Sequence, residues 1–204
     1  VRELVAMLNG MPVPVREKIR LVVAVLTPDD ETEFPTARKN AGWGWFTGYS
    51  SYEREGFVEF LRKKYNRNET HRTSAKLNLV WGGSFPYLDT NTVNVNSFDW
   101  ETLKPQYGSF PKGRKDFVDY RAGVLKRFID DCARIVRPYY DFGAQFGSIY
   151  DEGIELRHTY DVTPLLEHVD CIINDDIVEY EPNFAFVADY MRSLCRYWDW
   201  VRKK

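Results

Sequence analysis

The sequence predicts an α+β fold in a single domain, residues 1–204, built on a mainly antiparallel sheet with three or more helices packed against it. A chain of this length buries a sizeable core without a metal or disulfide staple. Its composition, 44% hydrophobic and 28% charged, is typical of an ordinary globular domain. Candidate strands and helices are mixed along the chain without the regular alternation of a doubly wound parallel sheet. Residues 1–12 form either a short helix or a loose N-terminal arm.

Four segments of the first half are predicted as strands. Residues 17–26 become fully apolar toward their end and stop at turn residues. Residues 43–49 alternate aromatic and small side chains, and residues 75–81 also have the composition of a strand. In residues 90–98, valine alternates with asparagine, which indicates one dry and one wet face.

Three segments are predicted as helices. Residues 50–65 open with Ser50 and Glu53 in the spacing of a capping box. Residues 113–136 carry Phe117, Val124, Phe128 and Ile135 at helical spacing and end before a proline.

The last helix, residues 183–201, follows Pro182 and places an apolar stripe on one face. On this phase Trp198 belongs to the core, whereas Trp200 is off the stripe and partly exposed. Residues 170–180, just before this helix, are predicted as two short strands around an Asn-Asp-Asp turn.

Three cysteines, Cys132, Cys171 and Cys195, form an odd and sparse set, which is typical of reduced thiols rather than of a secreted disulfide scaffold. Cys132 and Cys195 fall on the predicted apolar helix faces, where a thiol packs as a small hydrophobic group.

Motifs of catalysis are missing from the sequence. The segment Trp81 to Phe85 lacks the second glycine of a nucleophile elbow, and no phosphate-binding glycine loop is present. We therefore predict no catalytic residue, no metal and no cofactor. The alternative is a small metal-dependent hydrolase that uses Glu155, His158, Asp161 and His168. As solvated polar side chains, these four residues would carry no chemistry.

Charge is distributed unevenly along the chain. The formal net charge is only −2, yet residues 141–189 contain twelve acidic residues and a single base, Arg157. Such a segment repels nucleic acid and suits a basic protein partner. The alternative is compensation within the molecule, through ion pairs with the basic remainder of the chain, for example with Arg134, Arg137 or residues 62–64.

Aromatic residues accompany the acidic segment, and tyrosine and tryptophan are frequent in protein interfaces, although each of them can equally belong to the core. We predict a partner-binding surface in which two tyrosines anchor the acidic residues and two tryptophans contribute more weakly. Its residues are Asp151, Glu152, Glu155, Asp175, Asp176, Glu179, Glu181, Tyr150, Tyr160, Trp43 and Trp45.

Two short motifs resemble a bacterial family of polymorphic-toxin immunity proteins, immunity protein family fifty-two. They are residues 44–55 (GWFTGYSSYERE) and residues 80–83 (VWGG). Residues 91–108 and 139–142 match no part of that pattern. The resemblance implies a cytoplasmic antidote that binds a cognate secreted toxin, commonly a DNase with a basic cleft, and that needs no catalytic residue.

A cytoplasmic location is also expected because no apolar segment follows a basic start and no apolar run approaches the ~20 residues of a membrane span. We accordingly expect a toxin protein as the partner and neither nucleic acid nor a membrane. A phage or accessory structural protein is a further alternative, compatible with the composition.

Overall fold

The computed structural model describes residues 1–24, 37–39, 42–45, 50–65, 74–89, 111–146, 162–174 and 181–203. The chain divides into two compact units. The first, named here the parallel-sheet unit, comprises Val1–Pro35 and Ala122–Lys204. The second, the inserted unit, comprises Thr36–Arg121 and interrupts the first in the sequence.

Three strands form the sheet of the parallel-sheet unit. They are β1 (Leu21–Ala24), β4 (Asp141–Phe146) and β5 (Cys171–Asn174), in the order β1-β4-β5. Both pairings are parallel, with Leu21 opposite Asp141 and Gly143 opposite Cys171. As the central strand, β4 buries residues on both of its faces, which is typical of a parallel sheet.

The prediction of a mainly antiparallel sheet is therefore wrong. Antiparallel strands can be joined by short turns. Parallel partners instead need long crossover connections, and more than a hundred residues separate β1 from β4. An antiparallel pair does occur in the inserted unit, between β2 (Ala37–Lys39) and β3 (Gly42–Trp45).

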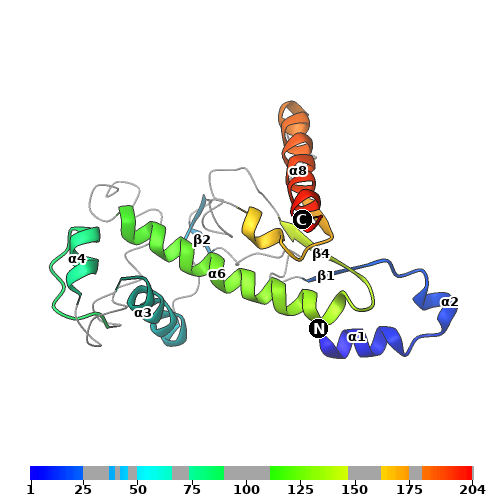
Figure 1. The fold of residues 1–204 in the computed structure, drawn as a ribbon, viewed down its shortest axis with the longest axis horizontal. Coiled ribbons are helices and arrows are strands. Elements are labelled where there is room, and N and C mark those ends of the chain that lie inside the picture. Colours follow the sequence, from blue (N-terminus) through cyan, green and yellow to red (C-terminus); the bar gives the residue numbers. More distant parts are fainter. Residues whose placement is uncertain are drawn as a thin grey trace. The chain divides into compact units, whose positions relative to one another are not determined.

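One hydrophobic core holds the parallel-sheet unit together. Side chains from the sheet meet those of helix α1 (Arg2–Asn9), of the C-terminal part of helix α6 (Pro111–Val136), of the 3-10 helix η2 (Thr163–Leu166) and of helix α8 (Glu181–Arg202) (Figure 1). A short helix, α2 (Val13–Arg16), connects α1 to β1. The N-terminal residues thus form a helix whose Val5 and Leu8 are buried.

Gly143 lies where the sheet is most tightly packed. A Cβ atom built there would meet the side chains of Leu21 and Val23 on the neighbouring strand at 3.1 Å each. A larger residue at Gly143 would therefore require these two side chains to shift by a few tenths of an ångström.

The inserted unit packs helix α3 (Ser51–Tyr65) and helix α4 (Ala75–Trp81) against the N-terminal part of α6, Pro111–Arg121 (Figure 1). Its core is rich in aromatic rings. Phe57 of α3 lies edge-on to Phe117 of α6, with 5.1 Å between ring centroids, and stacks on Trp81 of α4 at 6.5 Å.

Residues 75–81 form this helix and not the predicted strand. Leu77 and Trp81, four residues apart, are both buried, whereas Leu79 between them is 84% exposed. Residues four apart share one face of a helix. The helix ends at Gly82, whose φ of 75° is the left-handed conformation that glycine adopts most readily.

Several local predictions are confirmed. The amide of Glu53 donates to Ser50 Oγ at 3.2 Å, as expected of a capped helix start, and α6 ends at Val136, two residues before Pro138. Residues 21–24 of the first predicted strand, 43–45 of the second and 171–174 of the pair before the last helix are extended, whereas residues 17–20 of the first are not part of a strand. Nearly all of the remainder of these predicted strands lies outside the described residues. Residues 90–98 lie outside the described residues.

The last helix is confirmed with one error. Trp198 packs against the core and donates from Nε1 to the Thr163 carbonyl at 3.1 Å, while Trp200 is exposed. Cys132 is buried as predicted, but Cys195 is exposed, because the buried face of α8 passes through Leu194. Among the described helices none is both long and apolar enough to cross a membrane.

Candidate functional site

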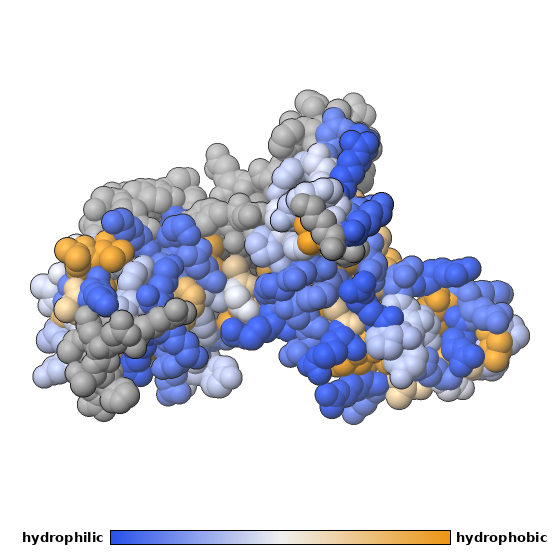
Figure 2. Space-filling view, viewed as in Figure 1, coloured by the Kyte–Doolittle hydropathy of each residue, from blue (hydrophilic) through white to orange (hydrophobic). Residues whose placement is uncertain are grey.

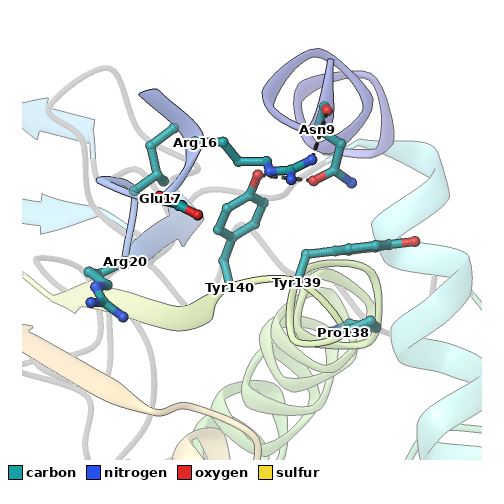
Figure 3. Close-up of a pocket in the computed structure, with 8 residues that line it drawn as sticks. Asn9, Arg16, Glu17, Arg20, Pro138, Tyr139 and Tyr140 are labelled. Atoms are coloured by element: carbon teal, nitrogen blue, oxygen red, sulfur yellow. Dashed lines mark hydrogen bonds between the residues drawn. The ribbon is translucent and has the colours of Figure 1, made fainter. Parts of the chain in front are cut away.

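An open groove in the parallel-sheet unit is the candidate site. It lies where the segment from α1 to β1 meets the turn between α6 and β4 (Figure 3). Two adjoining cavities of about 860 and 340 Å³ make up this groove. The residues that line both are Ile19, Arg20, Pro138, Tyr139 and Tyr140. Each of the two volumes is in the range of ordinary small-molecule sites.

Asn9 ties the two sides of the groove together. The hydroxyl of Tyr140, whose side chain is buried, donates to Asn9 Oδ1 at 3.0 Å, and Arg16 Nη1 donates to the Asn9 carbonyl at 3.3 Å (Figure 3). One residue at the end of α1 therefore holds both the α2 helix and the start of β4. The groove is formed before any ligand arrives.

The rim carries side chains that face solvent. Arg20 and Glu17 are exposed, and Tyr139 is 61% exposed. No ion pair or side-chain hydrogen bond joins these three side chains to another described residue. These three side chains are therefore available to a partner. The neighbouring Tyr140 differs from them, because its side chain is buried and its hydroxyl is bonded to Asn9.

The smaller cavity brings two acidic residues to the same groove. The Asp141 amide donates to the Arg20 carbonyl at 3.0 Å, which places the start of β4 beside the start of β1. Arg137 Nη2 lies 3.1 Å from Asp170 Oδ1, and the other carboxylate oxygen of Asp170 accepts from the Phe142 amide at 3.0 Å. Asp141 is exposed. The groove thus displays both an arginine and a carboxylate to solvent.

A separate cavity of about 580 Å³ lies beside His168 in the same unit. His168 Nδ1 is 2.9 Å from Asp130 Oδ1. Lys126 Nζ lies 2.8 Å from both Asp130 and Glu167. Burial alone would lower the pKa of Lys126, but its hydrogen bonds to these two carboxylates hold that pKa above its usual value. Burial acts to raise the pKa of Asp130, but Lys126 and His168 outweigh it, so that this pKa is lower than usual.

This network bears on the hydrolase alternative. His168 is paired with Asp130, which the sequence did not single out, while Glu155, His158 and Asp161 lie outside the described residues. Within the described part of the chain, no three His, Cys, Asp or Glu side chains gather as metal ligands.

The predicted partner-binding residues fall where the structure gives no side-chain position. Asp151, Glu152, Glu155, Asp175, Asp176, Glu179, Tyr150 and Tyr160 lie outside the described residues. Glu181 belongs to α8, and Trp43 and Trp45 belong to β3, with the placement of their side chains undescribed. The predicted partner-binding surface therefore lies outside what the structure describes.

Four of the twelve acidic residues of segment 141–189 are described outside these gaps, and three of them pair with the chain's own bases. Glu167 pairs with Lys126, Asp170 with Arg137 and Asp189 with Arg192. For these three, the alternative of compensation within the molecule holds. Asp141 is the exception, since it is exposed at the groove.

Sequence reasoning missed the groove. The sequence predicts no role for Tyr139, Tyr140, Arg16 or Arg20. A signal was present in the position of the two tyrosines, directly after the helix-ending Pro138. Apolar side chains of α1 and α2, among them Leu4, Met7 and Val13, are also exposed. Figure 2 shows small orange patches among the hydrophilic surface of these helices.

A comparison with models of known protein families gives no match, and a comparison with curated proteins gives none either.

Proposed function

We propose that this chain is an immunity protein, which binds and neutralises a cognate bacterial toxin in the cytoplasm of the cell that makes both. The toxin is a DNase with a basic cleft. One observation carries the proposal: twelve acidic residues stand against one base in residues 141–189. The resemblance of residues 44–55 and 80–83 to immunity protein family fifty-two supports it.

The physical reason is complementary charge. A nuclease holds the phosphates of DNA in a positively charged cleft. A protein that presents carboxylates in their place blocks that cleft and is also drawn to it, because complementary potentials raise the rate of encounter more than the final affinity. Such an inhibitor needs shape and charge but no catalytic group.

Of the four acidic residues of the segment that are described, Asp141 supports the proposal, because it faces solvent. Glu167, Asp170 and Asp189 count against it, since each forms an ion pair within the chain. The pair of Asp189 with Arg192 is exposed and contributes about 0–1 kcal/mol, whereas the other two pairs involve partly buried side chains. Tyr139, which lines the same cavity as Asp141, is 61% exposed, and tyrosine is enriched in protein interfaces.

The test begins with the gene next to that of this chain, which the proposal expects to encode a secreted nuclease; that nuclease is then used as the toxin. The variant Asp175→Lys/Asp176→Lys reverses two charges of the acidic segment. The matched control Glu3→Lys/Glu55→Lys makes the same change of charge at two exposed residues, in α1 and in α3. Survival of cells that co-express the toxin, and calorimetric titration at low and high salt, measure neutralisation and binding.

We expect the wild type to protect the cells. We expect Asp175→Lys/Asp176→Lys to bind at least about tenfold more weakly, with a shallower dependence on salt, because close charges at an interface are screened by added ions. The control keeps most of the affinity. If the wild type neither binds nor protects, the proposal fails. An equal loss in both variants would show that net charge alone, and not the acidic segment, attracts the toxin.

A further inference from the structure

We infer that the outer edge of strand β5 receives an extended segment of the toxin, which pairs with it as an added strand and carries lysine or arginine beside the paired residues. The inference rests on the proposed function. It adds a backbone contact, next in the sequence to the acidic residues, that charge attraction alone does not provide.

The inner edge of β5 is bonded to β4. The Asp170 amide donates to the Phe142 carbonyl at 2.8 Å, so the backbone of Phe142 faces β5. Backbone groups alternate in direction along a strand, and Ala144 therefore faces β5 as well. In a parallel pair, a residue that faces its neighbour bonds to the residues on either side of its register partner, which for Ala144 is Ile172. The N–H and C=O of Ile172, and of Asn174 two residues on, consequently point away from β4.

These outward backbone groups are left for a partner. Among the described strands, β5 is paired with β4 alone. Within the described part of the chain, the outward groups of Ile172 and Asn174 have one contact, a weak one from the Cys171 thiol to the Ile172 carbonyl at 3.9 Å. Unpaired N–H and C=O groups along a strand edge form a template for another strand, and an extended backbone matches their spacing.

The side chains of β5 leave this edge accessible. Cys171, Ile172 and Ile173 are all half-buried, whereas four of the six residues of the central β4 are buried. Proteins often protect an exposed edge with a proline, a lysine or a bulge. The described strand, Cys171–Asn174, has the sequence Cys-Ile-Ile-Asn and an unbroken register with β4, so it carries none of the three. An edge of this kind is suited to strand addition.

Charge selects the kind of segment. Residues 170–181 contain five acidic residues and no base. Asp170 is paired with Arg137, so the charge left to a partner belongs to the residues that follow β5, beginning with Asp175 and Asp176. A second copy that paired through its own β5 would bring the same acidic residues to the edge and be repelled. A segment with lysine or arginine is attracted, and the proposed function already directs a basic toxin to these two aspartates.

The other edge of the sheet differs in charge. Residues 16–20, which lead into β1, contain three bases and one acid. A basic segment is repelled there, so β5 is the edge that fits the toxin. The competing arrangement pairs β5 of one copy with β1 of the next, and it would make the chain associate with itself in the absence of any toxin.

The test changes one backbone donor. Asn174→Pro removes an outward N–H without touching the bonds to β4, and an edge strand tolerates proline where its N–H faces outward. Asn174→Ala is the matched control, because it changes the same side chain and keeps the N–H. Calorimetric titration with the toxin at low and high salt measures both variants, and circular dichroism verifies that they are folded.

We expect Asn174→Pro to bind about tenfold more weakly, because it loses one interface hydrogen bond and its ring blocks the approach of the added strand. The dependence on salt should stay as in the wild type, since no charge has changed, which distinguishes this variant from Asp175→Lys/Asp176→Lys. Asn174→Ala should bind within about twofold of the wild type.

Hydrogen exchange of the wild type, followed by NMR, gives a readout that needs no variant. Without the toxin, the amides of Ile172 and Asn174 should exchange faster than those of Cys171 and Ile173, which face β4. The toxin should slow the exchange of Ile172 and Asn174 at least about tenfold. A segment of the toxin that contains lysine or arginine should be slowed in the same complex.

The two proposals fail in different ways. A wild-type chain that neither binds the toxin nor protects overturns the proposed function and this inference with it. If the wild type binds and protects while the amides of Ile172 and Asn174 keep their rates, or while Asn174→Pro binds as tightly as Asn174→Ala, the edge contact alone is overturned. A slowed toxin segment without lysine or arginine would contradict the inference as well. So would a chain that associates with itself in sedimentation and is made monomeric by Asn174→Pro, since the occupant of the edge would then be a second copy.

Discussion

Both units of the chain place charged side chains close to tyrosines, but the hydrogen bonding of these side chains differs between the two units. In the inserted unit the side chain of Asp116 is 3% exposed and accepts three hydrogen bonds. They come from Lys64 Nζ at 2.6 Å, from the Tyr65 hydroxyl at 2.6 Å and from Trp81 Nε1 at 2.8 Å. Along the groove of the parallel-sheet unit, Arg20 and Tyr139 face solvent without a described partner.

The pKa values in the inserted unit reflect this engagement. Burial raises the pKa of Tyr65, and its hydrogen bond to Asp116 raises it further. Burial lowers the pKa of Lys64, but Asp116 and Asp119 more than compensate, so that the ammonium is held charged. Identical residue types are therefore structural where their hydrogen bonds are satisfied within the chain, and candidates for recognition where they are not.

Asp116→Ala gives the largest effect that this comparison predicts. It leaves the indole of Trp81 without this acceptor and removes the carboxylate that pairs with Lys64. Breaking a buried charge network by removing one member costs about 3 kcal/mol in the free energy of unfolding. Urea unfolding followed by far-UV circular dichroism measures this loss.

Asp119→Ala is the matched control for that measurement. Asp119 also pairs with Lys64, at 3.2 Å, but its side chain is 30% exposed and shares the contact with Lys115. It should lose less than about 1 kcal/mol. Equal losses for the two variants would contradict a structural role specific to Asp116.

Asp130→Asn tests a partly exposed network in the parallel-sheet unit and should have a smaller effect. The folded-state pKa of Asp130 is lowered by Lys126 and His168. The stability that it contributes is therefore present at neutral pH and is lost as the pH falls below about 4 and through the folded pKa. The variant should be less stable at pH 7 by under about 1 kcal/mol.

Urea unfolding at a series of pH values checks this linkage. The difference between the wild type and Asp130→Asn should shrink as the solution becomes more acidic. Asp131→Asn, which removes an exposed carboxylate from the next position of the same helix, is the control. A gap between wild type and Asp130→Asn that is constant with pH would show that the asparagine acts through packing rather than through charge.

Local features of the fold could be predicted from the sequence, and non-local ones could not. Two helix ends were predicted correctly from signals that lie within one or two helical turns. They are the spacing of Ser50 and Glu53, and the position of Pro138 after an apolar stripe. The pairing of β1 with β4 depends on segments more than a hundred residues apart. No spacing in either segment specifies a parallel partner, and the predicted antiparallel sheet was wrong.

The same limit applies to the sites. Asn9 and Tyr140 make their hydrogen bond across 131 positions of sequence. Arg20 becomes a candidate only after that contact has formed a groove around it. The acidic segment was visible as a composition, but ion pairs such as that of Asp170 with Arg137 were not. Composition predicts how much charge a segment carries, whereas three-dimensional contacts decide how much of it is left for a partner.

The smallest expected change in stability tests most directly whether the exposed groove residues differ from the buried residues of the inserted unit. Arg20→Gln and Tyr139→Ala should each change the free energy of unfolding by less than about 0.5 kcal/mol, because surface side chains with no bonding partner contribute little to stability. Urea unfolding measures this beside the binding titrations. If either variant lost as much stability as Asp116→Ala, its side chain would be part of the fold after all. Weaker toxin binding with unchanged stability would instead mark the groove as a surface kept for recognition.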